Sequence, residues 1–369
     1  MRILHLLPHL SGGGAERQFT YLAPELVRRG HRVDVAYLSS GPVKIEINGV
    51  ALHRLSLRSN YDPYLLWQLF RLIRQIKPDI IHTWILQMDI LGGIAARLYG
   101  IPWLLREPSS AMAYLPTWKQ RLRVLIASGT SAIVSNSAGG DEYWKAQNPA
   151  SHRYIVANGL AIEDIDQTVA ADPPGFLPSS FPIVLYVGRL IVSKNLTVFL
   201  EALAHVKQQK NILGILCGEG PQKSELAALR HQLGLDEDVN FTGYIPTTAV
   251  WALMKKASVF VSLSAYEGCP NTLTEAMACG CPLVLSDIPA HREILDENSA
   301  LFVDPTNIQQ TVDRIVQVLS DTEAAKNRVL MAKHKTREWS ITAMADNYEK
   351  IYDEVIYRFN QSLASGVGS

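Results

Sequence analysis

Short apolar runs alternate with longer amphipathic segments along the first half of the chain. The runs that predict strands are 3–7, 32–38, 50–55, 79–82, 103–106, 132–134 and 154–156. Segments between them, such as 15–29 and 89–99, have the 3.6-residue period of helices. Because strands that alternate with helices form parallel sheets, the pattern predicts an α/β fold with a doubly wound sheet.

The pattern occurs twice, and a proline-rich segment separates the two halves. Strands and helices alternate again from Ile183 to about 303, and the remainder is helical through 307–319, 321–337 and 341–359. Four prolines and a glycine between 170 and 182 are typical of a linker. The predicted organisation is a first domain at 1–165, a linker at 166–182, a second domain at 183–340 and a last helix at 341–360. A chain of 369 residues is long enough for two cores.

Glu267 and Glu275 belong to the most informative segment, 266–278, which follows the apolar run 259–263. The segment predicts a strand, a glycine-containing loop and a helix, whose first backbone N–H groups stabilise negative charge. The loop is therefore suited to an anion, and the two carboxylates are suited to hydroxyls on either side of it. A nucleotide-sugar, with hexose, diphosphate and ribose, has this layout. The alternative is a helix capped by Asn271 with two solvated glutamates.

Two cations follow another strand of the second half. The apolar run 184–187 ends in Gly188 and Arg189, and Lys194 precedes the next helical pattern. Two such cations can neutralise a diphosphate without a metal. Two more strands end in glycine turns, at 218–221 and 243–246, where a ligand can approach the backbone closely.

Together these motifs resemble the retaining glycosyltransferases of the GT4 type. The resemblance rests on Gly188-Arg189 with Lys194, the turn at 218–221, the Glu-x7-Glu pair and the glycine-rich segment 12–16, and it covers nearly the whole chain. It implies a GT-B fold, in which two Rossmann-like domains face a central cleft and the last helix returns to the first domain. The first domain would bind the acceptor and the second the nucleotide-sugar.

The resemblance also implies roles for individual residues. The residues assigned to catalysis are Arg189, Lys194, Glu267 and His82. The residues assigned to the donor are Gly13, Gly14, Gly188, Gly218, Glu219, Tyr244, Asn271, Thr272, Leu273 and Glu275, and the acceptor candidates are Glu16, Arg106 and Glu107. Glu267 would hold the hexose and Glu275 the ribose. Many members hold the donor sugar with an N–H at the position of Pro270, which has none, so the sugar specificity is open.

These motifs allow other interpretations. A dinucleotide-binding G-x-G-x-x-G would require glycine at Arg17, and no acidic residue ends the second strand, so a dehydrogenase is disfavoured. The glycines at 12–14 are also compatible with a turn packed under its helix. His82 is expected to close the strand 79–82 and point into the cleft, and a core histidine is equally compatible. The acidic segment 236–238 is expected to be a solvated turn rather than a metal site.

Charge suggests partners for the first half. The formal net charge is zero, which argues against nucleic-acid binding, but residues 1–165 carry 18 basic and 12 acidic residues, a net charge of +6. Segments 64–77 and 111–126 combine Trp or Tyr with Lys and Arg, as interfacial helices do. Trp118, Lys119, Arg121 and Arg123 would then face an anionic membrane. Amphipathic helices that cover a sheet have the same pattern.

The sequence therefore predicts a retaining, metal-independent glycosyltransferase without a cofactor. It would move a hexose from a UDP- or GDP-sugar to a glycan or lipid-linked acceptor, in the synthesis of a cell-surface polysaccharide or glycolipid. The alternatives are a nucleotide-sugar epimerase of the same fold and a non-catalytic nucleotide-sugar binding protein. The four cysteines read as small buried residues, and the N-terminus shows no signal-peptide pattern. We expect a cytoplasmic protein, with peripheral attachment to the inner face of a membrane if the interfacial interpretation holds.

Overall fold

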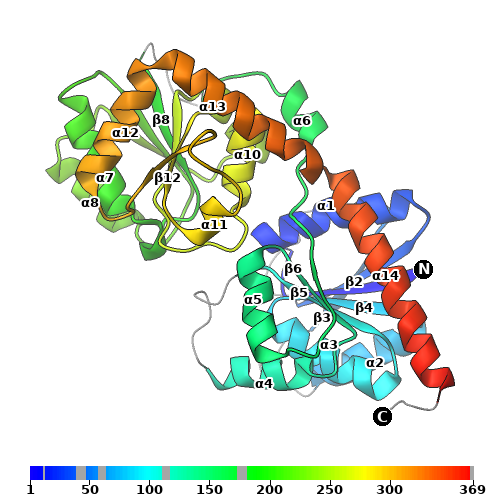
Figure 1. Cartoon of the computed structure of the whole chain (residues 1–369). Helices are drawn as coiled ribbons and strands as arrows, with labels where there is room; N and C mark the ends of the chain where they lie inside the picture. The colour runs from blue at the N-terminus through cyan, green and yellow to red at the C-terminus, as the bar shows by residue number, and fades with distance from the viewer. Residues whose placement is uncertain (11–12, 39–46, 57–63, 110–116, 173–180, 366–369) are drawn as a thin grey trace. The chain divides into compact units, whose positions relative to one another are not determined.

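The computed structural model divides the chain into two compact units. Unit 1 contains residues 1–159 and 339–369, and unit 2 contains residues 160–338 (Figure 1). The structure describes all residues except 11–12, 39–46, 57–63, 110–116, 173–180 and 366–369. Gly12 and the centre of the expected linker lie outside the described residues. The domain limits expected at 165 and 340 lie a few residues from the limits of the two units.

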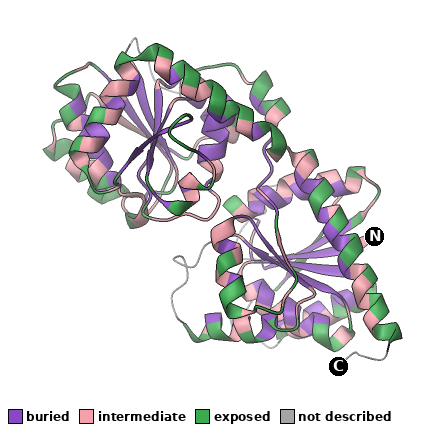
Figure 2. Ribbon diagram, in the orientation of Figure 1, coloured by how far each residue is buried: buried purple, intermediate pink, exposed green. Residues whose placement is uncertain are grey.

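Unit 1 is built on a parallel sheet with the strand order β3-β2-β1-β4-β5-β6-β7. The strands are β1 (Arg2–Leu7), β2 (Arg32–Leu38), β3 (Ala51–Leu55), β4 (Ile80–Trp84), β5 (Trp103–Glu107), β6 (Ala132–Ser135) and β7 (Arg153–Ile155). The central strands are almost wholly buried (Figure 2), because helices cover both faces of the sheet. This explains why they appear in the sequence as continuous apolar runs.

The helices of unit 1 form one layer on each face of that sheet. They are α1 (Gly14–Arg28), α2 (Tyr64–Ile76), α3 (Leu86–Tyr99), α4 (Trp118–Ala127), α5 (Ala138–Gln147) and α14 (Ile341–Ala364). Apolar residues of α1 and α14 share one core cluster, and those of α2 to α5 share another. Glu349 of α14 pairs with Arg29 at 2.9 Å and with His31 at 2.7 Å. The last helix therefore packs against α1 of unit 1.

Unit 2 repeats the architecture, with the strand order β10-β9-β8-β11-β12-β13 and all described pairs parallel. The strands are β8 (Ile183–Val187), β9 (Leu213–Cys217), β10 (Val239–Gly243), β11 (Val259–Ser262), β12 (Leu283–Ser286) and β13 (Leu301–Val303). The helices are α6 (Ile162–Gln167), α7 (Leu196–Lys207), α8 (Lys223–Gln232), α9 (Thr247–Lys256), α10 (Asn271–Cys279), α11 (Pro289–Arg292), α12 (Ile308–Ser320) and α13 (Thr322–Lys335). Short 3₁₀ turns lie at Val192–Lys194 and Thr336–Trp339.

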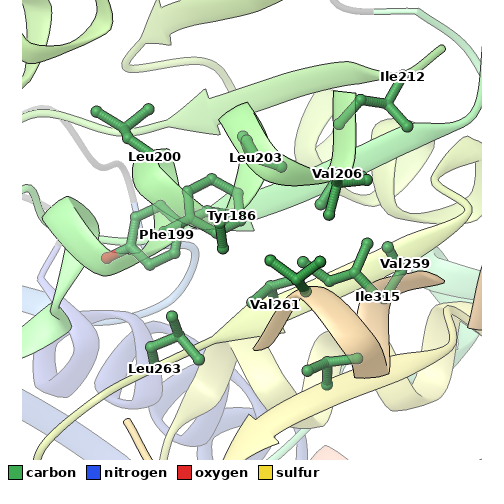
Figure 3. Close-up of a cluster of buried hydrophobic side chains, with 14 of the residues drawn as sticks. Tyr186, Phe199, Leu200, Leu203, Val206, Ile212, Val259, Val261, Leu263 and Ile315 are labelled. Atoms are coloured by element: carbon green, nitrogen blue, oxygen red, sulfur yellow. The ribbon is translucent and has the colours of Figure 1, made fainter. Parts of the chain in front are cut away.

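One core of unit 2 lies between the sheet and the helices α7, α8 and α12. Figure 3 shows Tyr186 of β8 beside Phe199 of α7, with ring centroids 6.2 Å apart, and Val259 and Val261 of β11 pointing to the same side. Successive residues of a strand face opposite sides of the sheet, so Phe260 is buried on the other side. The carboxyl end of β11 is thereby fixed from both faces.

The order in which the chain adds strands to each sheet reverses once. In unit 1 the chain builds outward from β1 to β3 and then returns to add β4 on the other side of β1; in unit 2 β11 is added beside β8 in the same way. Ligands of open α/β sheets bind outside the carboxyl ends of the strands at such a point. The fold therefore singles out the loops after β1 and β4 in unit 1, and those after β8 and β11 in unit 2.

Candidate active site

The loop between β11 and α10 carries Glu267. Its carboxylate forms an ion pair with the Lys194 ammonium and accepts a hydrogen bond from the Ser264 hydroxyl at 2.7 Å. Both charged side chains are 17% exposed, so the pair is largely shielded from solvent. Lys194 ends the 3₁₀ turn after β8, and the loop after β8 is tied to the loop after β11 by the Ala265 N–H, which donates to the Ser193 carbonyl at 2.8 Å. The structure thus brings together two residues that are 73 positions apart.

A polar network lies beneath Glu267. The Ser286 hydroxyl at the end of β12 donates to the Ser264 carbonyl at 2.6 Å and lies 3.2 Å from Nδ1 of His291. That Nδ1 is also 2.8 Å from the Ser286 carbonyl oxygen, which can only accept, so Nδ1 carries the proton. Burial lowers the pKa of His291 below its ordinary value, so its imidazole is neutral near pH 7. This network supports the loop that carries Glu267.

Arg189 follows β8 on the same side of the sheet. Its side chain is exposed, and its guanidinium makes no ion pair with the part of the chain that the structure describes. Its carbonyl accepts a hydrogen bond from the Tyr186 hydroxyl at 2.9 Å. Burial, and then the negative charge of Glu267, raise the pKa of Tyr186 above its ordinary value. Arg189 therefore presents a cation to solvent beside the Lys194–Glu267 pair.

Glycines let the loops after β8 and β9 touch. A Cβ on Gly218, whose φ is +144°, would lie 1.9 Å from the Gly188 carbonyl oxygen, so no larger residue fits there. The Leu190 N–H also donates to the Glu219 carbonyl at 3.0 Å. The Glu219 side chain is 51% exposed and pairs with Lys223 at 2.9 Å. Tyr244, after β10, is 78% exposed.

Helix α10 begins directly after Pro270, at the end of the loop that carries Glu267. Asn271 and Thr272 are half-buried, whereas Leu273 is fully buried and anchors the first turn. Glu275 is only 2% exposed. It lies one turn before Cys279, and burial, with Glu275 as the next cause, raises the pKa of the Cys279 thiol to about 12. The two glutamates thus differ in burial, since the Glu267 side chain is 17% exposed and Glu275 is 2% exposed.

His82 does not close its strand, because β4 continues to Trp84. The imidazole is fully buried, its Nδ1 lies 2.7 Å from the Tyr352 hydroxyl of α14, and its ring stacks on Trp84 at 4.8 Å. Burial and the neighbouring His5 and Arg106 hold its pKa well below the ordinary value. The expectation that His82 closes its strand is wrong, and its buried position fits the core histidine that the sequence also allowed.

Arg106 and Glu107 are also buried, and they face opposite sides of the sheet because they are consecutive strand residues. Arg106 donates to the Tyr348 hydroxyl of α14 at 2.9 Å and also bonds Asn158. Glu107 pairs with Arg123 at 3.0 Å and accepts from the Trp144 indole at 2.9 Å. The two residues do not hold each other, and both are enclosed within unit 1.

The structure contradicts the expectation that Arg123 faces a membrane. Its guanidinium is fully buried and pairs with Asp89 at 2.7 Å as well as with Glu107. Trp118 is 58% exposed, and Arg121 is exposed two residues before the buried arginine. Arg123 lies on the side of α4 that faces the sheet. The amphipathic pattern of this helix therefore includes one buried cation.

Glu16 lies in the first turn of α1 and is 7% exposed. Gly13, which precedes this helix, allows the carboxylate to fold back, because a Cβ there would lie 2.2 Å from Glu16 Oε2. Gly13 and Gly14 are both exposed at the helix start. Glu16 lines a cavity of unit 1, whereas Arg106 and Glu107 are buried in strand β5.

Comparison with known sequences now decides the family. The sequence model of the glycosyl transferases group 1 matches residues 170–335, and that of Glycosyltransferase Family 4 matches residues 12–164. The chain belongs to the GT4-type glycosyltransferases. The two matched ranges end and begin close to the limit between units 1 and 2, so each unit carries one half of the family pattern.

Two relatives of this glycosyltransferase are similar over nearly their full lengths. The lipopolysaccharide core biosynthesis glycosyltransferase LpsD of Rhizobium meliloti is 26% identical, with 96% of this chain and 98% of that protein covered. An alpha-1,4-N-acetyl-D-galactosaminyltransferase of Campylobacter jejuni, named for a saccharide on PP-undecaprenol, is 24% identical, with 96% and 99% covered. The crystal structure of HepE from Anabaena in complex with UDP-glucose superposes with a TM-score of 0.83 at 19% identity, covering 96% of this chain and 100% of that one. This structural likeness confirms the GT-B fold.

Sequence reasoning missed several residues around the candidate site. Ser264, Ser286 and His291 lie in three different segments, and their contacts depend on how strands β11 and β12 pair. A hint was available for Ser264, because it stands three residues before Glu267.

The acidic segment at 236–238 lies before β10, where Asp236 pairs with His231 at 2.6 Å and Asp238 pairs with Lys207.

Proposed function

We propose that this glycosyltransferase transfers a hexose, with retention of configuration and without a metal, from a UDP- or GDP-sugar to a glycan or lipid-linked acceptor. The observation that carries the proposal is the convergence of Arg189, Lys194, Glu267 and the start of α10 at the switch point of the unit 2 sheet. Cations and a helix N-terminus at one sheet edge suit a diphosphate, and the adjacent carboxylate suits sugar hydroxyls.

In the proposed complex, the donor lies along the loops after β8, β9 and β11. Arg189, Lys194 and the first turn of α10 bind the diphosphate, Glu267 binds hexose hydroxyls and Glu275 binds the ribose. Gly218 and Gly188 have no side chains where the two loops touch, so the loops leave room for the phosphates. Lys194 and Glu267 pair with each other in the structure; on donor binding, Lys194 is expected to be shared between the carboxylate and the diphosphate.

The reaction would proceed by front-side displacement. The bond between the anomeric carbon and the leaving phosphate oxygen breaks while the acceptor oxygen bonds to the same face of that carbon. The proton of the acceptor hydroxyl passes to the departing diphosphate. The protein's part is to position both substrates and to stabilise the charge that develops on the diphosphate, which is the task assigned to Arg189 and Lys194.

The relatives support the class of acceptor. One is named for lipopolysaccharide core biosynthesis and another for a saccharide on PP-undecaprenol. We therefore place this enzyme in the synthesis of a cell-surface polysaccharide or glycolipid. Among the described helices none is both long and apolar enough to cross a bilayer.

A basic-aromatic face of unit 1 supports peripheral attachment to an anionic membrane. It comprises the outer residues of α2, α3 and α4, namely Tyr64, Trp67, Arg71, Arg74, Arg97, Leu98, Trp118, Lys119, Arg121 and Leu125. The one carboxylate of these three helices, Asp89, is buried and paired. Aromatic side chains at 51% and 58% exposure among cations suit the headgroup region of a bilayer.

The test is a screen of donor hydrolysis and transfer across UDP- and GDP-sugars, in excess chelator, with and without a pool of glycan and lipid-linked acceptors. The proposal predicts that one donor is consumed, faster when acceptor is present, and that the product keeps the anomeric configuration of the donor by NMR. Transfer with inverted configuration would refute retention. Binding of donors without any turnover would favour a non-catalytic binding protein.

A further inference from the structure

Asn195, directly after Lys194, has an unusual backbone and an unusual side-chain contact. Its φ is 51° and its ψ is 41°, the left-handed region that residues other than glycine seldom adopt. It is also the N-cap residue of α7, where an asparagine side chain usually accepts a hydrogen bond from the first N–H groups of the helix. Here it accepts none from α7, whose residues the structure describes in full. Left-handed backbone and an unused cap at one position point to another role for the side chain.

The Asn195 side chain contacts the end of β11 instead. Its Nδ2 donates to the Leu263 carbonyl at 2.9 Å, and the facing atom must be the nitrogen because a carbonyl oxygen only accepts. Leu263 is 2% exposed, and its side chain lies in the core of unit 2 (Figure 3). The carbonyl is therefore a fixed point, and the bond joins it to a residue 68 positions away.

Two hydrogen bonds to the loop after β11 flank Lys194. On one side the Ala265 N–H donates to the Ser193 carbonyl at 2.8 Å, and on the other lies the bond made by Asn195. Lys194 itself pairs with Glu267 in the same loop. A lysine side chain has many rotamers, so fixing its backbone on both sides reduces the entropy that is lost when its ammonium is held in one place.

The left-handed backbone accounts for the choice of asparagine. Asn195 alone separates the 3₁₀ turn at Val192–Lys194 from α7, so the chain changes direction at this residue. The next residue, Leu196, is 2% exposed and starts α7 in the core. Glycine would adopt this backbone more readily but has no side chain. Among residues that tolerate the left-handed region, asparagine also carries an amide donor for the carbonyl.

We propose that Asn195 is a positioning residue for Lys194. Its amide fixes the turn to the end of β11, so the ammonium is already beside Glu267 when the diphosphate of a donor arrives. Asn195 does not touch the donor and acts through the lysine. The proposal rests on the proposed function for the role of Lys194, and it goes further by naming what holds that lysine in place.

Amide hydrogen exchange at Ala265, followed by NMR on the full chain without ligand, tests the link between the two loops. Asn195→Gly removes the amide but suits the left-handed backbone, so the fold should be kept. Exchange at Ala265 should become about 2- to 12-fold faster, the scale of one neutral hydrogen bond. Asn195→Asp keeps the size of the side chain, but its carboxylate cannot donate to the carbonyl, and it should have the same effect. Unchanged exchange in both variants would overturn the proposal.

Calorimetry with UDP and with GDP tests whether the effect passes through Lys194. Asn195→Gly should weaken binding about 2- to 12-fold in the wild-type background. In the Lys194→Ala background it should change the affinity by less than about twofold, because no ammonium is left to position. An equal loss in both backgrounds would mean that Asn195 only supports the fold, and the proposal would be wrong.

Lys77→Gly is the matched control. Lys77 lies in unit 1 and also has a left-handed backbone, with φ 49°. Its replacement by glycine relieves the same kind of strain far from the loops of unit 2 in sequence. It should leave both the exchange at Ala265 and the nucleotide affinity unchanged.

The same proteins separate this proposal from the proposed function. If the wild type turns over a donor and Asn195→Gly matches it in exchange and in nucleotide affinity, the positioning role alone fails. If the wild type binds UDP or GDP but turns over no donor with any acceptor, the proposed function fails. A loss of affinity in Asn195→Gly that depends on Lys194 would then still support the positioning role.

Discussion

The contact between Lys194 and Glu267 makes a double-mutant cycle informative. Alone, Lys194→Ala and Glu267→Ala are each expected to lower turnover by ~10²–10³-fold, the scale of removing one preorganised charge-stabilising group, or about 2.7–4 kcal/mol. If the two side chains acted independently at opposite ends of the donor, the double mutant would lose ~10⁴–10⁶-fold. The structure pairs them with both side chains 17% exposed, so removing either partner leaves the other without its counter-charge. The double mutant should therefore lose little more than either single mutant.

The assay is kcat/KM for donor turnover in the wild type, the two single mutants and the double mutant. The matched control is Lys207→Ala, which breaks the Lys207–Asp238 pair of the same unit away from the site. This pair is more exposed, so its loss should change stability by at most about 1 kcal/mol and should leave kcat/KM unchanged. A double mutant whose loss approaches the product of the single losses would refute the coupling.

Three further predictions address other residues. Glu275→Ala should weaken binding of free UDP or GDP by roughly 10- to 150-fold, whereas Glu267→Ala should leave that binding nearly intact; calorimetry that finds equal affinity in both variants would remove the ribose role. Arg121→Ser should reduce sedimentation with anionic liposomes about fivefold without loss of stability, whereas Arg123→Ser should lower the free energy of unfolding by about 3–5 kcal/mol, as urea titration would show. Burial lowers the pKa of His5 to about 3, so the unfolded chain binds its proton first, and stability should fall as pH drops from 6.5 toward 3, by about 1.4 kcal/mol per pH unit for this group; an unchanged slope in His5→Phe would contradict this.

The fold was predictable because the strands are buried on both faces. A buried parallel strand requires a run of apolar residues, and a covering helix requires an amphipathic one, so element type and order follow from period alone. The position of Glu267 after β11 and of Arg189 after β8 could be predicted for the same reason. Strand ends were less certain, and the two extra residues of β4 were enough to move His82 from the sheet edge into the core.

Contacts between distant segments could not be predicted from the sequence. Arg123 and Arg121 look alike in an amphipathic helix, and only the packing of α4 on α3 shows that Arg123 meets Asp89. The link from Ser264 to His291 likewise depends on the register of β11 and β12. Contacts between side chains of common types on different strands leave no pattern in the local sequence.

The most direct test of the central claim is the melting temperature of the protein with UDP or GDP in excess EDTA. The account predicts that one nucleotide stabilises the fold, by roughly 2.7 kcal/mol at 100 times its dissociation constant, because Arg189 and Lys194 supply the neutralising charge. Arg189→Ala should fold normally, since the side chain is exposed, and should lose most of the stabilisation. Stabilisation that appears only with Mg²⁺ or Mn²⁺, or with neither nucleotide, would contradict the assigned donor site.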